Sequence, residues 1–449
     1  MLKHITPKRL IIYSFLIWVI AYTLIPATYI LHNSFYPVLV LVLYNAGLLF
    51  GLFSVKKVDE EKYKQPDSLP RPDYYTIVIS FCIGVFGACL KLYQLIFVQN
   101  LLTVNGFALR EAQIYSAEFN SGALGLIIAL TFPFAIVSFL ATFYYQKYFS
   151  KTLLIFSGLF ASVYMLSSLL NESRLPMALS LFIFFIVWYF YQVRYGRFFY
   201  NNFQIKLGSI KLFKLPKFFT RWYVVLVFIA ISVALSFSTK VMVNRLNHYN
   251  YKDVLTVWEG YHETIIDGDF KNEINKLPKQ EKNIAVAKYS LYHYFAHGVV
   301  EFQRLVNHLD DKNGIYYGKY ELDVYAKFFR FFGLNIQTKK EMNEVIYKRG
   351  YYVTFWGPFY LDFGLFGVFI CFFLGRFIKK TYLKASLGYL PAILMYSYLA
   401  VNLMASLHVT FFGSSYMYIF NAIVVFWILR KLASKSTVVV INQRAQKTE

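Results

Sequence analysis

Long apolar runs separated by short polar segments set the pattern of this chain. Several runs continue for about 18 residues or more without a charge, which lets a helix cross a hydrocarbon core of about 30 Å. A polytopic membrane protein is therefore the class that fits. The pattern predicts an all-α fold of ten membrane-spanning helices, with ends defined to a few residues, at 10–31, 37–55, 74–98, 122–146, 152–171, 175–193, 223–239, 355–375, 385–405 and 411–430.

The segments that connect these runs alternate between strongly basic and nearly free of positive charge. Lys and Arg in short loops stay on the cytoplasmic side of a membrane. The alternation therefore predicts that both termini are cytoplasmic. Counted with Arg430, the basic class holds 26 basic and 6 acidic residues, in segments 1–9, 56–73, 147–151, 194–222, 376–384 and 431–449.

One loop dominates the opposite side. Residues 240–354 form a segment of about 115 residues with 17 basic and 14 acidic side chains. Within it, 284–307 is apolar and aromatic but too broken to span, which is typical of an interfacial or re-entrant helix, and 322–334 is a second amphipathic candidate. The predicted organisation is a first helical region, 1–239, the outer loop 240–354 as a roof over an outward-facing site, a second helical region, 355–430, and a basic tail, 431–449.

Composition agrees with this organisation and excludes other classes. The 449 residues are 57% hydrophobic and only 16% charged, whereas ordinary soluble domains carry about 25% charged residues. A net charge of +22 would suggest nucleic acid in a soluble protein, but nearly all of it lies in the basic loops and is an orientation signal. We therefore expect no nucleic-acid partner. All three cysteines lie inside apolar runs, so no disulfide framework is expected.

Few charges lie at membrane depth, and each is a functional hypothesis. Glu172 and Arg174 form a tight outer hairpin, where the Arg fork suits a phosphate; an ion pair or a lipid headgroup contact is the alternative. Asp362, about seven residues into the run 355–375, must be hydrogen-bonded, paired or protonated. A structural hydrogen bond and a catalytic or substrate-binding role both remain open for it.

Histidines form the next group of candidates. His293, His297 and Glu301 share one helix face, but no fourth ligand is apparent, so we expect sugar contact or an interfacial face rather than a metal. His408 is either a general base or an interfacial residue. No nucleotide-binding loop is present, and no cofactor is expected. The excess of Tyr and Trp in 240–360 suits a sugar-binding surface.

Two strings carry a family resemblance. Residues 350–367 (GYYVTFWGPFYLDFGLFG) resemble the signature that follows the long periplasmic loop in Wzy-type oligosaccharide repeat-unit polymerases, which build O-antigen and capsule. Residues 171–174 (NESR) are similar to that family's G-S/T-R hairpin. Asn171 and Glu172 depart from the family's small residues, and Tyr351 and Tyr352 replace its Asn-Val portion. The resemblance in topology covers the whole chain, whereas the motifs cover about 25 residues.

The resemblance implies a GT-C-like glycosyltransferase of the bacterial inner membrane. Such an enzyme transfers a growing chain from undecaprenyl diphosphate to the non-reducing end of an incoming lipid-linked unit, alongside a flippase and a chain-length regulator. Arg174 carries over as the group that stabilises the leaving diphosphate. Arg110, Arg304 and Arg349, on the same side, with Tyr352 and His297, are candidates for substrate binding, and Asp362, Glu172, His297 and His408 compete as base. The alternatives are an O-antigen ligase and a flippase or other transporter.

Overall fold

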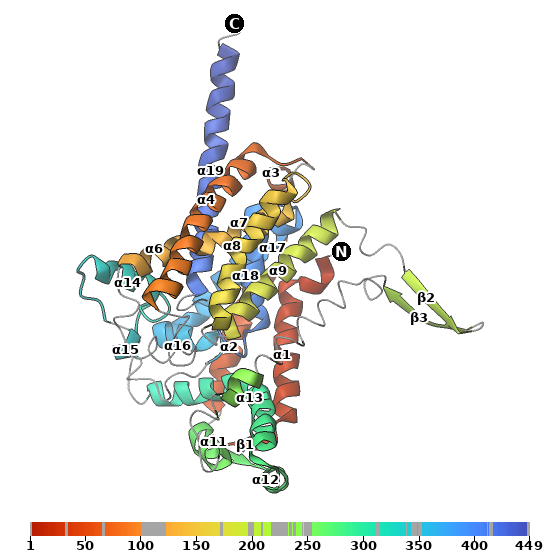
Figure 1. Ribbon diagram of the computed structural model, residues 1–449, viewed down its shortest axis with the longest axis vertical. Coiled ribbons are helices and arrows are strands. Elements are labelled where there is room, and N and C mark those ends of the chain that lie inside the picture. The colour runs from red at the N-terminus through yellow and green to blue at the C-terminus, as the bar shows by residue number, and fades with distance from the viewer. Residues whose placement is uncertain are drawn as a thin grey trace.

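The computed structural model describes most of the chain (Figure 1). The described segments are 2–31, 35–64, 68–99, 123–170, 174–195, 202–207, 210–216, 254–310, 315–337, 339–342, 353–410 and 416–446, with short pieces between 232 and 246 and residues 348 and 412. Within them the molecule is a helical bundle, which confirms the prediction of a helical polytopic membrane protein.

Eight helical stretches among these described residues are long and apolar enough to cross a membrane. Each matches one of the predicted runs. They are α1 (Pro7–Leu24), α2 (Phe35–Phe53), α4 with η2 (Arg71–Tyr93, Gln94–Val98), α6 with α7 (Ala123–Thr131, Pro133–Tyr144), α8 (Lys151–Leu170), α9 (Arg174–Tyr195), α16 with η5 and α17 (Trp356–Phe363, Gly364–Phe366, Gly367–Ser386) and α19 (Met417–Gln446).

The two other predicted runs differ in outcome. The run 385–405 forms α18 (Leu390–Met404), a helix of 15 residues in which every residue from Leu390 to Leu403 is buried. A helix that is apolar all round belongs in the interior of a bundle, and α18 packs against α1, α7, α9, α17 and α19. The run 223–239 lies almost wholly outside the described residues.

Glycines bring the backbones of α2 and α17 close together. Gly47 and Gly51 on α2 face the backbone of α17 at Val368 and Phe372, and Gly375 on α17 faces the carbonyl of Leu48. A Cβ at Gly47 would lie 2.6 Å from the Val368 carbonyl oxygen. Small residues four apart are the usual means by which membrane helices approach backbone to backbone.

One end of the bundle, called the basic end below, gathers the ends of the basic segments. Asp73 at the start of α4 is fully buried, pairs with the Arg430 guanidinium of α19 and accepts a 3.0 Å hydrogen bond from the Tyr145 hydroxyl. Arg194 at the end of α9 donates 3.2 Å to the Gly388 carbonyl in the α17–α18 turn. The ends of segments 56–73 and 194–222 therefore lie on one side of the bundle with Arg430.

The opposite end, called the loop end, carries elements of the predicted outer loop. Its long helix α13 packs against α1, α2 and α16 (Figure 1), and Trp18 of α1 donates 3.1 Å to the Ala296 carbonyl of α13. A short antiparallel pair joins the chain just after α1 to this loop. The elements are β1 (Ala27–Tyr29) with β4 (Thr264–Ile266), α11 (Val254–His262), α12 (Gly268–Asn275), α13 (Lys279–Asp310), α14 (Asp323–Phe331) and α15 (Lys339–Met342).

The remaining elements lie outside the spans. They are η1 (Leu2–Ile5), α3 (Glu60–Tyr63) and the antiparallel pair β2 (Asn202–Leu207) with β3 (Ile210–Pro216). The two strand pairs are additions to the all-α prediction. Figure 1 shows the β2–β3 pair projecting from the side of the bundle.

Candidate functional site

A polar face of α13 is buried at the loop end. His293, His297, Glu301 and Arg304 succeed one another at intervals of three or four residues and therefore share one face of the helix. Each is at most 6% exposed. The face turns toward the start of the loop, because α11, β4 and β1 pack over it and share a small apolar core with α1. Polar side chains buried this deeply in a helix must find partners.

Arg304 is the centre of this polar cluster. Its Nη1 donates 3.0 Å to the His262 carbonyl and 2.6 Å to the Glu301 carboxylate. Its Nη2 donates 3.0 Å to the Ile30 carbonyl and 2.9 Å to that of Glu263. Its Nε lies 3.3 Å from the Glu263 carboxylate. One guanidinium thus ties α13 to the ends of α11 and β1.

The charges of the cluster balance. The ammonium of Lys348 lies 3.0 Å from the second carboxylate oxygen of Glu263, so two acids face two cations. Burial raises the pKa of Glu301, and the neighbouring Arg304 and Lys348 oppose that rise. The donors of Arg304 are committed to groups of this protein. Substrate binding by Arg304 stays a prediction. It would require a substrate to replace some of these hydrogen bonds.

Three histidine rings contact one another in a row beside the charged cluster. The His262 and His293 ring centroids are 3.9 Å apart, and those of His293 and His297 are 4.8 Å apart. The Tyr29 hydroxyl lies 3.0 Å from Nδ1 of His293, and Nδ1 of His297 lies 2.7 Å from the His293 carbonyl oxygen. Burial lowers the pKa of all three, to about 2 for His262 and about 4 for His297. The imidazoles are therefore neutral at neutral pH.

These neutral imidazoles make the loop end sensitive to acid. Four buried histidines, His408 included, have lower pKa values in the folded protein than the 6.5 of an unfolded chain. Their contribution to stability is therefore fully present above about pH 6.5 and is lost as the pH falls toward the pKa values of the folded protein. Each contributes up to about 1.4 kcal/mol per pH unit in that window. The raised pKa of Glu301 has the opposite effect, because the folded state binds this proton more tightly than the unfolded state does. This is one group, whereas the histidines are four.

We therefore expect the melting temperature of the detergent-solubilised protein to fall between pH 7.5 and pH 5. Thermal unfolding followed by intrinsic fluorescence measures this fall. His408→Gln removes one titrating group and should make the dependence less steep. A melting temperature that is constant over this interval would contradict the assignment of buried neutral histidines.

His408 lies between the cluster and the bundle. It follows α18, and its Nδ1 lies 2.7 Å from the Phe295 carbonyl oxygen of α13. Burial lowers its pKa to about 4. Backbone hydrogen bonds to Phe295 and to Ser14 of α1 oppose that shift in pKa. Gly298 permits this approach, because a Cβ there would lie 2.6 Å from the Leu407 carbonyl oxygen.

Asp362 holds a turn of the loop. Its two carboxylate oxygens accept hydrogen bonds of 2.9 Å and 2.8 Å from the backbone N–H groups of Tyr320 and Glu321. Its carbonyl accepts 2.9 Å from the N–H of Tyr317. These hydrogen bonds agree with a structural role for Asp362, which is one of the two roles that the sequence left open. A catalytic role for Asp362 stays a prediction.

Backbone strain concentrates at the loop end. The non-glycine residues with left-handed backbone in the described segments are Glu263, Tyr317 and Thr354, with φ of 49°, 52° and 59°. A β-branched residue in this region is uncommon, and Thr354 stands directly before the buried helix α16. Such conformations persist only where surrounding contacts hold them, and they cluster at functional sites. Glu263 belongs to the cluster, and Tyr317 belongs to the Asp362 turn.

The other predicted site residues are only partly placed. Arg174 begins α9, whose other end carries Arg194 at the basic end, so the backbone of Arg174 lies at the loop end. Its side chain lies outside the described residues, as do Arg110, Glu172, Arg349 and Tyr352. Of the nine predicted residues, the structure therefore brings His297 and Arg304 into one cluster and sets His408 against the same helix.

Sequence reasoning missed several members of the cluster. Tyr29, His262, Glu263 and Lys348 were not expected to meet α13. The adjacent His262 and Glu263 in an otherwise apolar and aromatic stretch were the only available signal. Within the described segments, no group of three or more His, Cys, Asp or Glu residues is arranged to hold a metal ion.

The cluster supplies neutral bases and a desolvated charge network beside the membrane, which suits acid–base chemistry on a polar substrate. Comparison with family models, characterised proteins and solved structures finds no match.

Proposed function

We propose that this protein is a membrane-embedded glycosyltransferase that polymerises undecaprenyl-diphosphate-linked oligosaccharide repeat units. The growing chain leaves its lipid carrier and joins the non-reducing end of an incoming unit at the outer face of the bacterial inner membrane. The observation that carries the proposal is the position of the string 350–367. Its first helix, α16, is buried from Trp356 to Asp362 where the loop meets the bundle, and Arg174 begins its helix at the same end.

The proposed chemistry divides between a cation and a base. Displacing a lipid diphosphate develops negative charge on the leaving group, and the planar fork of Arg174 stabilises it without a metal. The acceptor hydroxyl needs a proton acceptor. His408 is the base that the geometry favours, because it is neutral and lies where α13 meets the chain after α18. The oxygens of Asp362 are engaged by two backbone donors.

The proposal extends to the orientation, the fold and the partners of the protein. Both termini are cytoplasmic, the fold is GT-C-like with ten spans, and the enzyme works beside a flippase and a chain-length regulator. The basic segments that meet at one end of the bundle support the orientation, because positive loops stay in the cytoplasm.

The test is a substitution at Arg174 in cells that make the polysaccharide. Arg174→Ala should abolish long-chain polymer, a loss of at least about 100-fold for a group that stabilises transition-state charge. The single-unit glycolipid should persist. Gel electrophoresis of extracted glycolipid, with immunoblotting for protein level, measures both.

Lys288→Ala is the matched control, because Lys288 is an exposed cation on α13 at the same end. It should leave the ladder of chain lengths unchanged. Full-length polymer in the Arg174→Ala strain at normal protein level would overturn the proposal. Loss of the single capped unit as well would favour a ligase or a flippase.

A further inference from the structure

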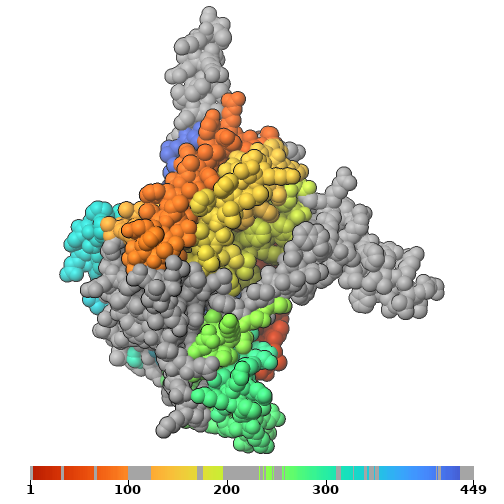
Figure 2. Space-filling model, in the orientation of Figure 1, coloured from red at the N-terminus to blue at the C-terminus, as the bar shows by residue number. Residues whose placement is uncertain are grey.

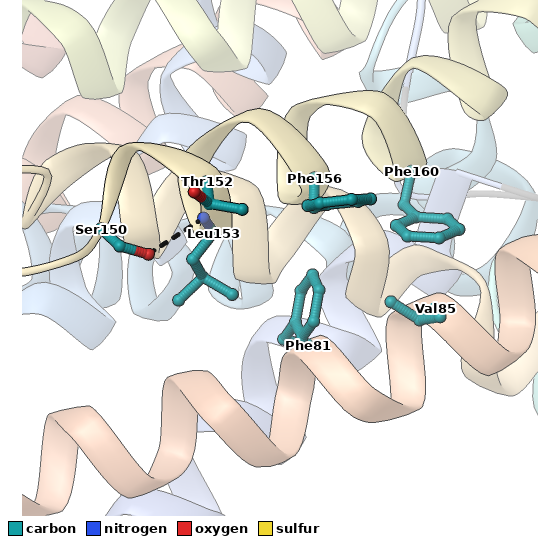
Figure 3. Close-up of a pocket in the computed structure, with 7 residues that line it drawn as sticks. All are labelled: Phe81, Val85, Ser150, Thr152, Leu153, Phe156 and Phe160. Carbon is teal, nitrogen blue, oxygen red and sulfur yellow. Dashed lines mark hydrogen bonds between the residues drawn. The ribbon is translucent and has the colours of Figure 1, made fainter.

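A groove opens between α4 and α8 on a face of the bundle far from the polar cluster. It has a volume of about 460 Å³, within the range of small-molecule sites. Phe81 and Val85 of α4 line one wall, and Leu153, Phe156 and Phe160 of α8 line the other (Figure 3). In Figure 2 the two helices lie side by side on the visible face, α4 in orange and α8 in yellow. The groove therefore opens on the outside of the bundle, between two helices that are long and apolar enough to cross a membrane.

The two ends of the groove differ in polarity. Ser150 and Thr152 line its end near the start of α8, and the aromatic rings lie toward the other end (Figure 3). The rings of Phe81 and Phe160 meet edge to face at 6.4 Å. At the polar end, Lys151 stands between the two hydroxyl residues and is exposed, and the connecting segment 145–152 contains Lys147 but no acid. A ligand with an anionic head and an apolar tail matches this gradient.

The length of the groove fits one leaflet. The ten steps from Ser150 to Phe160 advance about 15 Å along a helix at 1.5 Å per residue, which is half of a hydrocarbon core of about 30 Å. Its polar end coincides with the basic end of the bundle, where anionic lipids gather beside Lys and Arg. A chain in the groove would thus run from the headgroup region toward the bilayer centre.

We propose that this groove is a binding site for an anionic glycerophospholipid of the leaflet at the basic end. One acyl chain lies between Phe81, Phe156 and Phe160. The headgroup phosphate lies against Lys151 and the hydroxyls of Ser150 and Thr152. The site is separate from the proposed catalytic end and does not depend on the proposed function.

The experiment uses the full chain in mild detergent, incubated with an equal mixture of dioleoyl phosphatidylglycerol and dioleoyl phosphatidylcholine. Native mass spectrometry counts the lipids that the protein retains. We expect one retained phosphatidylglycerol in preference to phosphatidylcholine. Lys151→Gln should lower this preference about fivefold, because a Lys near the surface contributes about 1 kcal/mol toward an anionic lipid. Val85→Trp fills the groove and should reduce the retention of both lipids.

Leu159→Trp is the matched control, because it places the same side chain on the exposed face of α8 at a residue that does not line the groove. It should retain lipid as the unaltered protein does. If Val85→Trp does not fold, Phe156→Ala replaces it, since Phe156 is already 51% exposed and its loss weakens only the groove wall. Equal retention in the groove variant and the control, or an unchanged lipid preference in Lys151→Gln, would overturn the proposal and leave non-specific annular lipid.

Discussion

Replacing Arg304 with Ala is expected to destabilise the loop end by about 3–5 kcal/mol, the usual cost of removing one partner from a buried ion pair. The guanidinium is 5% exposed and joins the carboxylates of Glu301 and Glu263 with three backbone carbonyls. Its removal leaves Glu301, whose side chain is 2% exposed, without its closest cation. The carbonyl of Ile30 loses the hydrogen bond that holds the segment after α1 against α13.

Hydrogen exchange of backbone amides in α13 and in 263–266 measures this effect, because it reports local opening of the loop end. Exchange there should become faster, whereas α2 and α17 should be unchanged. Lys271→Ala is the control, since Lys271 pairs with Glu259 at 2.7 Å but is 31% exposed, and such pairs contribute about 0–1 kcal/mol. Protection in Arg304→Ala equal to that in the control would show that Arg304 does not fasten the loop.

Gly51→Leu is expected to abolish the packing of α2 against α17. A Cβ at Gly51 would overlap the carbonyl oxygen of Phe372, so even one added carbon has no space at this crossing. Overpacking usually costs about 1–3 kcal/mol, and a backbone contact cannot relieve it by a change of rotamer. We expect a cost at the upper end of this range or above it, with low yield of folded protein.

The measurement is the melting temperature in detergent together with the monodisperse fraction after size exclusion. Gly158→Ala on α8 is the matched control, because a Cβ there would meet only a Phe139 ring carbon, at an ordinary 3.4 Å. That substitution should be tolerated. Equal stability of the two variants would refute the close pairing of α2 and α17.

Hydropathy predicts the spans well because the bilayer demands about 20 apolar residues whatever the helix packs against. It does not distinguish a helix that faces lipid from a helix enclosed by others, as α18 shows. The run 385–405 is as apolar as the other runs, yet every residue from Leu390 to Leu403 is buried among neighbouring helices. The break at Gly364, between α16 and α17, also leaves no mark in hydropathy, although its φ of +50° requires a residue such as glycine.

In the candidate site, local relations could be predicted from the sequence and long-range contacts could not. Helical spacing predicts that His293, His297 and Glu301 share a face, because that relation is local. The hydrogen bonds of Arg304 to the carbonyls of Ile30, His262 and Glu263 were not predicted from the sequence. Backbone carbonyls carry no sequence signature, and a contact across more than two hundred residues leaves no periodic pattern.

The pairing of β1 with β4 also has a consequence for synthesis. Tyr29 pairs with Thr264, about 235 residues later in the chain. At about 5–20 residues per second, translation needs on the order of 10–50 s to reach that partner. During this interval α1 inserts while the chain is still bound to the ribosome, and β1 and the Ile30 carbonyl have no partners yet. The loop end is thus closed late in biogenesis, after α13 has been synthesised.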